Sequence, residues 1–154
     1  MIDVMNKTAF IGYRMIDYEH IRESLKNAII KEIDNGCRMF FVGTHGDFDK
    51  LALSICRELR SKYCKDLEIK IVLTSLNILN KEENPYFDVD TVFYDIENEY
   101  FKKRIIVSNK NMIDECNTLI CYVNTNKFGS GAKLILNYAK RKGLNIINLY
   151  DNDN

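Results

Sequence analysis

The feature that most constrains this sequence is the alternation of short apolar runs with segments of helical spacing. Each apolar run suits a strand of a sheet, and the segments between most of the runs carry apolar residues at helical spacing. This order predicts an α/β fold, a Rossmann-like three-layer sandwich with helices on both faces of a mostly parallel sheet. Strands are predicted at 8–11, 38–42, 68–73, 91–94, 118–123 and 145–149, and helices at 18–35, 48–62, 99–115 and 131–142.

The length of 154 residues fits a single domain, because no repeat, linker or low-complexity block divides the chain. We expect this domain to span residues 1–154, with its core at about 7–149. No apolar run approaches the roughly 18 residues of a membrane span. The N-terminus lacks the basic and then apolar pattern of a signal peptide. We therefore expect a cytoplasmic protein that does not enter a membrane.

The charge balance limits the partners. Lys and Arg number 22, as do Asp and Glu, and a net charge of zero makes nucleic acid an unlikely partner. A small anion held by a few groups remains compatible with this balance. The five cysteines form no Cys-x-x-Cys pair, and Cys37, Cys56 and Cys121 are interpreted as buried reduced thiols. His20 and His45 are isolated, so neither a metal site nor a cofactor is predicted.

Three predicted strand ends carry glycines or charges, at residues 12–14, 43–49 and 124–131. In a parallel sheet, ligands bind outside the carboxyl ends of the strands, near the point where the strand order reverses. We therefore expect these three segments to meet along one edge and to form a site for negative charge.

The stretch Gly43-Thr44-His45-Gly46-Asp47-Phe48-Asp49 is the most suggestive of the three. Gly43 and Gly46 are expected to take positive φ and to let a ligand approach closely. Asp47 is expected to cap the following helix, whose first N–H groups would then be free donors for a phosphate. His45 could act as an acid, a base or a donor, or be merely exposed. The alternative is a tight connection whose glycines serve geometry alone.

Arg14 directly follows the first predicted strand. Its guanidinium could hold a phosphate through two parallel hydrogen bonds, with Gly12 keeping the approach open, or it could pair with a surface carboxylate. Tyr13 either stacks on a base or ribose or covers the edge of the core.

The second glycine turn runs from Lys127 through Gly129, Ser130 and Gly131 into a predicted helix. Its backbone N–H groups and the Ser130 hydroxyl would wrap an anion, and Lys127 would add charge; the alternative is a flexible connection.

The predicted helix 99–115 holds further candidates. Asn109 could reach the ligand edge from this helix, whereas Asp114 could face either the site or solvent. The basic clusters 102–104 and 140–142 are interpreted as solvated helix faces. No nucleophile–base pair, phosphate-binding loop or Gly-x-Gly-x-x-Gly fingerprint is present.

The segment 75–90 is predicted to be irregular, and to be either functional or mobile. We expect Tyr86 and Phe87 to be exposed, where they could serve a partner such as the second copy in a homodimer.

Several motifs resemble those of the SLOG superfamily, in its small bacterial branch of uncharacterised proteins. Phe10-Ile11-Gly12-Tyr13-Arg14 resembles the branch's Phe-x-Gly-His-Arg opening, and residues 43–49 resemble its Gly-x-x-Gly-x-Phe/Val-Asp turn. Asn109 with Met112-Ile113 resembles its Arg-Asn-x-x-Met-Val helix, and 129–132 resembles its Gly-Gly-x turn. The resemblance covers residues 7–149 in order. Its signature residues fall on Gly12, Arg14, Gly43, Gly46, Asp49, Asn109, Gly129 and Gly131.

This resemblance implies a Rossmann-like fold that binds or senses a nucleotide-related small molecule, such as a nucleoside phosphate, ADP-ribose or a cyclic nucleotide. Relatives also include phosphoribohydrolases and DNA-uptake proteins, so a nucleotide N-glycosidase and single-stranded nucleic-acid binding are the alternatives. Tyr13 and Ser108 replace the branch's histidine and arginine, and no glutamate follows the second glycine turn. A hydrolase would need Asp47, Asp49 or Asp114 in its place, so the sequence favours a binding module.

Overall fold

The computed structural model describes residues 6–94, 101–127 and 129–150, and within them it has the predicted α/β fold. Strands and helices alternate as the apolar pattern predicts; residues 99 and 100, where a helix was expected to begin, lie outside the described residues. The elements are β1 (Lys7–Gly12), α1 (Tyr18–Asp34), β2 (Met39–Val42), α2 (Asp47–Lys62), β3 (Glu68–Leu73), the 3-10 helix η1 (Leu76–Asn80), β4 (Asp90–Phe93), α3 (Phe101–Asp114), β5 (Thr118–Tyr122), α4 (Gly131–Lys142) and β6 (Asn145–Asn148).

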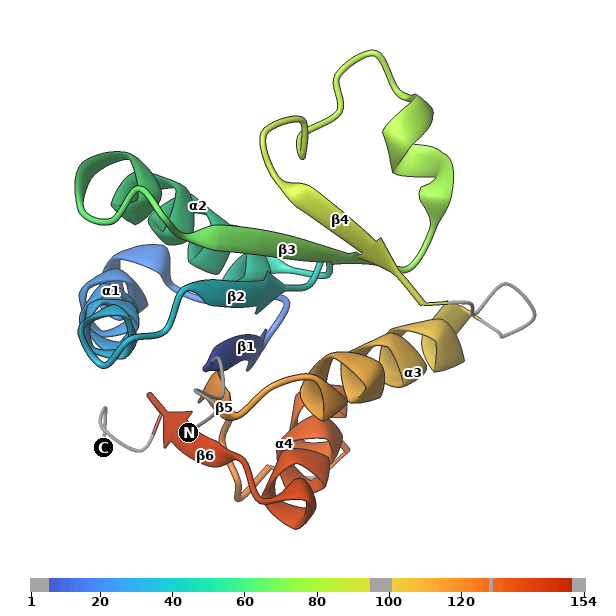
Figure 1. The fold of residues 1–154 in the computed structure, drawn as a ribbon. Coiled ribbons are helices and arrows are strands. Elements are labelled where there is room, and N and C mark those ends of the chain that lie inside the picture. Colours follow the sequence, from blue (N-terminus) through green and yellow to red (C-terminus); the bar gives the residue numbers. More distant parts are fainter. Residues whose placement is uncertain (1–5, 95–100, 128, 151–154) are drawn as a thin grey trace, which may run out of the picture.

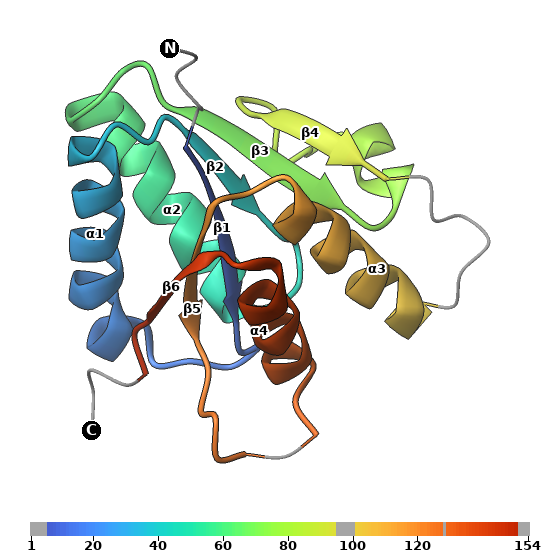
Figure 2. The same cartoon turned by 60° about the horizontal axis from the view of Figure 1, so that its bottom comes forward.

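The six strands form one parallel sheet with the order β4-β3-β2-β1-β5-β6 (Figure 1). Helices α1 and α2 lie on one face, and α3 and α4 lie on the other, as Figure 1 and Figure 2 show together. The strand order reverses between β1 and β5, whose register pairs Gly12 with Tyr122. Both strands therefore end at the same edge, where a crevice opens between the two helix layers.

The apolar core is divided by the sheet into two clusters. Phe10 of β1 packs with residues of α1 and α2, such as Leu25 and Ile55, whereas Ile11 packs with Met112 of α3 and Ile135 of α4. Burial on both faces explains why β1 is a continuous apolar run. Cys37, Cys56 and Cys121 are buried reduced cysteines, as predicted. None of the helices in the described ranges is long and apolar enough to cross a bilayer.

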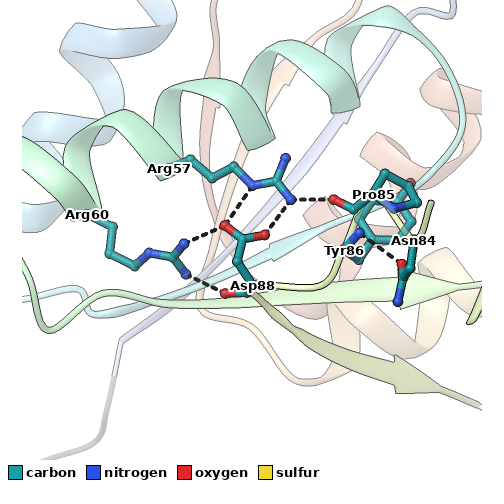
Figure 3. Close-up of polar contacts among 6 residues, drawn as sticks. All are labelled: Arg57, Arg60, Asn84, Pro85, Tyr86 and Asp88. Atoms are coloured by element: carbon teal, nitrogen blue, oxygen red, sulfur yellow. Dashed lines mark hydrogen bonds and ion pairs between the residues drawn. The ribbon is translucent and has the colours of Figure 1, made fainter. Parts of the chain in front are cut away.

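The segment between β3 and β4 is held against α2 by two arginines that grip Asp88 (Figure 3). Arg57 donates to both carboxylate oxygens, at 3.1 Å from Nε and 2.6 Å from Nη2, and also to the Pro85 carbonyl. Arg60 donates to the Asp88 carboxylate at 2.7 Å and to its carbonyl at 3.0 Å. The expectation that Tyr86 is exposed is wrong, because the anchored segment packs Tyr86 against the core, where it is partly buried. The same expectation for Phe87 is confirmed, since Phe87 is 84% exposed.

Replacing Asp88 with asparagine should lower the free energy of unfolding by about 1–2 kcal/mol at neutral pH, because both arginines lose a partly buried charge partner. Partial burial alone would raise the pKa of Asp88, but the hydrogen bonds and charge of Arg57, with the hydrogen bond of Arg60, lower it below the usual range. The stabilisation that ionised Asp88 gives the folded state is therefore fully present above the unfolded-state pKa of about 3.9. It disappears as the pH falls through the lower folded-state pKa.

Urea denaturation at pH 7 and at successively lower pH would measure this difference. Asp90→Asn is the control, because Asp90 pairs with Lys70 while its side chain is 67% exposed, and such pairs contribute little. Equal losses in the two variants would contradict a special role of Asp88.

Candidate functional site

A pocket of about 570 Å³ opens at the carboxyl edge of the sheet, beside the ends of β1 and β5. One side is formed by the β1–α1 loop and by residues that follow β2, and the other by α3 and the start of α4. This volume is within the range of small-molecule and cofactor sites. The lining residues are Ile11, Gly12, Tyr13, Arg14, His45, Asp49, Lys102, Ile105, Ile106, Asn109, Lys127, Gly129, Ser130, Gly131, Ala132 and Ile135.

Most residues singled out in the sequence lie together in this pocket. The three segments that were expected to meet along one edge do meet there. Gly43, Thr44 and Gly46 are not among the lining residues, and Gly43 and Gly46 leave space for Asp49 and Arg14, which are. The predicted residues that line it are Gly12, Tyr13, Arg14, His45, Asp49, Asn109, Lys127, Gly129, Ser130 and Gly131.

Gly12 and the two glycines of the segment 43–49, the first glycine turn, lie close to atoms of other residues. Gly46 has φ of +106°, as expected, and a Cβ there would lie 2.4 Å from the Arg14 Cα. Gly43 does not take positive φ, contrary to the prediction; a Cβ there would lie 2.8 Å from Asp49 Oδ2, so its role is to leave space for that carboxylate. A Cβ on Gly12 would lie 2.2 Å from the Phe48 Cγ. Gly12 therefore leaves space for the Phe48 ring, and it also lines the pocket.

At the start of α2, two of the predicted phosphate donors are already used within the protein. Gly46, not Asp47, occupies the N-cap position, and no side chain caps the helix. The N–H of Asp47 donates to the Arg14 carbonyl at 2.8 Å, and that of Phe48 donates to the Tyr13 carbonyl at 3.3 Å. These two N–H groups thus hold the β1–α1 loop, and with it Arg14, at the edge of the pocket.

Arg14 is an exposed side chain that reaches the pocket. Among the described residues it forms no ion pair with a carboxylate. Tyr13 beside it accepts a hydrogen bond from the Asn124 N–H at 2.6 Å and contacts the Tyr122 ring edge-to-face. Tyr13 thereby ties the end of β1 to the loop after β5.

Asp49 is the one carboxylate among the lining residues that the structure describes. Its Oδ2 accepts a hydrogen bond from the backbone N–H of His45 at 2.9 Å. Burial raises the pKa of Asp49 to about 7, although the hydrogen bond from His45 opposes the shift. Near neutral pH the carboxyl group is therefore divided between its acid and its ionised forms.

His45 lies in the pocket as a neutral imidazole. Its Nε2 is 2.8 Å from the hydroxyl of Thr74, which follows β3 and is buried. Burial, and then the positive charge of Arg14, lower the pKa of His45 below its usual value. His45 therefore adds no charge to the site at neutral pH.

The second glycine turn leads into α4 in the expected way. Gly129 has φ of +77°. Ser130 is the N-cap of α4, and its Oγ accepts a hydrogen bond from the Lys133 N–H at 3.1 Å. Position 128 lies outside the described residues. No described residue accepts a hydrogen bond from the N–H of Gly131 or Ala132. Lys127 Nζ lies 5.2 Å from the centre of the Tyr13 ring. This corner of the pocket thus combines a helix N-terminus with a lysine.

Sequence analysis missed one wall of the pocket. Ile105, Ile106 and Ile135 form its apolar part, and Lys102, which was interpreted as solvated, also lines it. Three of these lining residues follow Lys102 at helical spacing: Ile105 after three residues, Ile106 after four and Asn109 after seven. They therefore share one face of α3, and this spacing was the available signal. Asp114 is elsewhere: it accepts from the Tyr138 hydroxyl at 2.7 Å and pairs with Lys142.

The fold and the pocket define an α/β protein of Rossmann-like architecture with a cationic pocket at the point where the strand order reverses. Comparison of the sequence with models of protein families finds no match, and comparison with curated proteins finds none either. In the described part of the chain, no group of three or more His, Cys, Asp or Glu side chains is placed to hold a metal ion.

Proposed function

We propose that this protein binds or senses a nucleotide-related small molecule in the pocket at the carboxyl edge. The observation that carries the proposal is the convergence of Arg14, Lys102 and Lys127 with the N-terminus of α4 and an apolar wall. Cations and unpaired N–H groups suit a phosphate, whereas the isoleucine side chains suit a flat apolar group such as a base. The motif resemblance to the SLOG superfamily supports the same ligand class.

Arg14 is the residue on which this proposal depends most. Arg14→Ala should weaken the binding of a nucleoside phosphate by about 10- to 100-fold, because a charge-assisted hydrogen bond contributes about 1.5–3 kcal/mol. Its backbone contacts to α2 do not involve the side chain, so the fold should persist.

A thermal-shift screen over nucleoside mono-, di- and triphosphates, ADP-ribose and cyclic nucleotides would test the proposal, because a ligand of the folded state must raise Tm. Arg22→Ala is the matched control, since Arg22 is an exposed arginine that pairs with Glu58 on the helices α1 and α2. Absence of any shift at millimolar ligand, or equal shifts in the wild type and Arg14→Ala, would refute this function.

Asp49 favours a second candidate function, cleavage of a nucleotide at its N-glycosidic bond. Of the three aspartates that could replace the glutamate of phosphoribohydrolases, Asp49 alone lines the pocket. Its raised pKa of about 7 suits proton transfer near neutral pH. Incubation with nucleoside monophosphates and NAD, followed by chromatography, would detect a released base, and Asp49→Asn should abolish the release. Complete recovery of the substrates would dispose of this candidate.

A further inference from the structure

A carboxylate in the wall of a cationic pocket calls for an explanation. Asp49 would repel an anionic ligand unless that ligand also donated a hydrogen bond to the carboxylate. The position is nevertheless built for it: Gly43 leaves space where a Cβ would lie 2.8 Å from Oδ2, and the His45 N–H fixes that same oxygen. The sequence thus places and orients this group with two neighbouring residues of the same turn.

The other oxygen of Asp49 is available for a ligand. No described residue donates a hydrogen bond to Oδ1, and Asp49 forms no ion pair within the described ranges. The ionised form of Asp49 only accepts hydrogen bonds, so a ligand that binds this form must supply a donor. A fully ionised phosphate has none. A nucleotide has donors in its sugar hydroxyls and in the amino groups of its base.

The surroundings of Asp49 distinguish the sugar from the base. His45 contacts Asp49 through its backbone N–H, and its imidazole is close enough to Arg14 for the arginine charge to affect it. Asp49 and Arg14 therefore both line the pocket beside His45, and Arg14 is the residue that we expect to hold a phosphate. The apolar wall belongs to α3 and α4, on the other side of the pocket. In a nucleotide, the group beside the phosphate is the sugar.

We propose that Asp49 accepts hydrogen bonds from the ribose hydroxyls of the ligand, so that the pocket selects ribonucleotides over 2′-deoxyribonucleotides. This inference rests on the proposed function, since it names the sugar of the same ligand. Loss of one hydroxyl leaves the carboxylate buried beside a ligand without its donor, and a site built for a hydroxyl discriminates strongly against the analogue that lacks it.

Isothermal titration calorimetry with ribonucleoside and 2′-deoxyribonucleoside 5′-monophosphates and 5′-diphosphates of all four bases would test the proposal. For the wild type we expect the ribonucleotide to bind at least tenfold more tightly than its deoxy partner. Asp49→Asn should reduce this ratio to less than threefold, chiefly by weakening the ribonucleotide. Asp47→Asn is the control; Asp47 is not a lining residue, its carboxylate accepts the Ile16 N–H, and the variant should keep the wild-type ratio.

The outcomes separate the two levels of the proposal. Equal binding of ribo and deoxy partners by the wild type would overturn the ribose inference and leave the proposed function standing. Selection among bases with no effect of the sugar would do the same, and would assign Asp49 to the base. Absence of binding by every nucleotide would overturn both. The wild-type ratio needs no variant, so a folding defect in Asp49→Asn would not affect this test.

Discussion

Replacing Gly46 with alanine should lower the free energy of unfolding by about 3 kcal/mol or more. Gly46 has φ of 106° and ψ of −178°, a region that residues other than glycine rarely adopt, at a cost of about 1–3 kcal/mol. The added Cβ would also lie 2.4 Å from the Arg14 Cα, which is backbone and cannot move without displacing the loop. The same substitution should therefore reduce ligand binding by shifting Arg14.

Gly36→Ala provides the matched control, because Gly36 has a similar φ of +102° but no atom within 4 Å of the added Cβ. Its cost should be about 1 kcal/mol, from the backbone conformation alone. Urea denaturation of both variants would measure the difference. Equal losses at the two positions would show that the contact between the first glycine turn and the Arg14 loop contributes nothing.

Asp49→Asn should make the protein more stable than the wild type above pH 7, by at most about 4 kcal/mol. Folding raises the pKa of Asp49 from about 3.9 to about 7, so between these values the folded state binds more protons than the unfolded state. Wild-type stability therefore falls as the pH rises from 4 to 7, and the loss is complete above pH 7. Asparagine does not titrate and can still accept the His45 N–H. Asp49 lines an open pocket, and its remaining exposure keeps the effect below the full value.

Thermal or urea denaturation of both proteins at pH 4, 5.5, 7 and 8.5 would give the pH dependence. The difference between variant and wild type should grow with pH and level off above 7. Asp66→Asn, at an exposed position, should show no such growth. A difference that is constant with pH would mean that Asp49 is ionised without penalty in the folded protein.

The candidate site illustrates where sequence reasoning succeeds and where it fails. The side chains at strand ends could be placed together, because parallel strands bring their carboxyl ends to one edge whatever their spacing along the chain. The function of each glycine could not be derived, because it depends on atoms from distant segments: Phe48 against Gly12, and Arg14 against Gly46. The N–H groups of Asp47 and Phe48 were wrongly predicted to be free for the same reason. The carbonyls that accept their hydrogen bonds belong to Arg14 and Tyr13, more than thirty residues away in the sequence.

The sequence by itself determined the alternation of strands and helices, the parallel sheet and the edge at which the pocket opens. Those properties follow from apolar periodicity and from the turn residues beside each element, which are local. Only the tertiary structure decided that Lys102 and the isoleucines of α3 and α4 line the pocket, and that Asp49 is half-buried there beside His45. The pKa of a carboxyl group, and the space around a glycine, depend on which segments fold against it, because desolvation and packing act between neighbours in space.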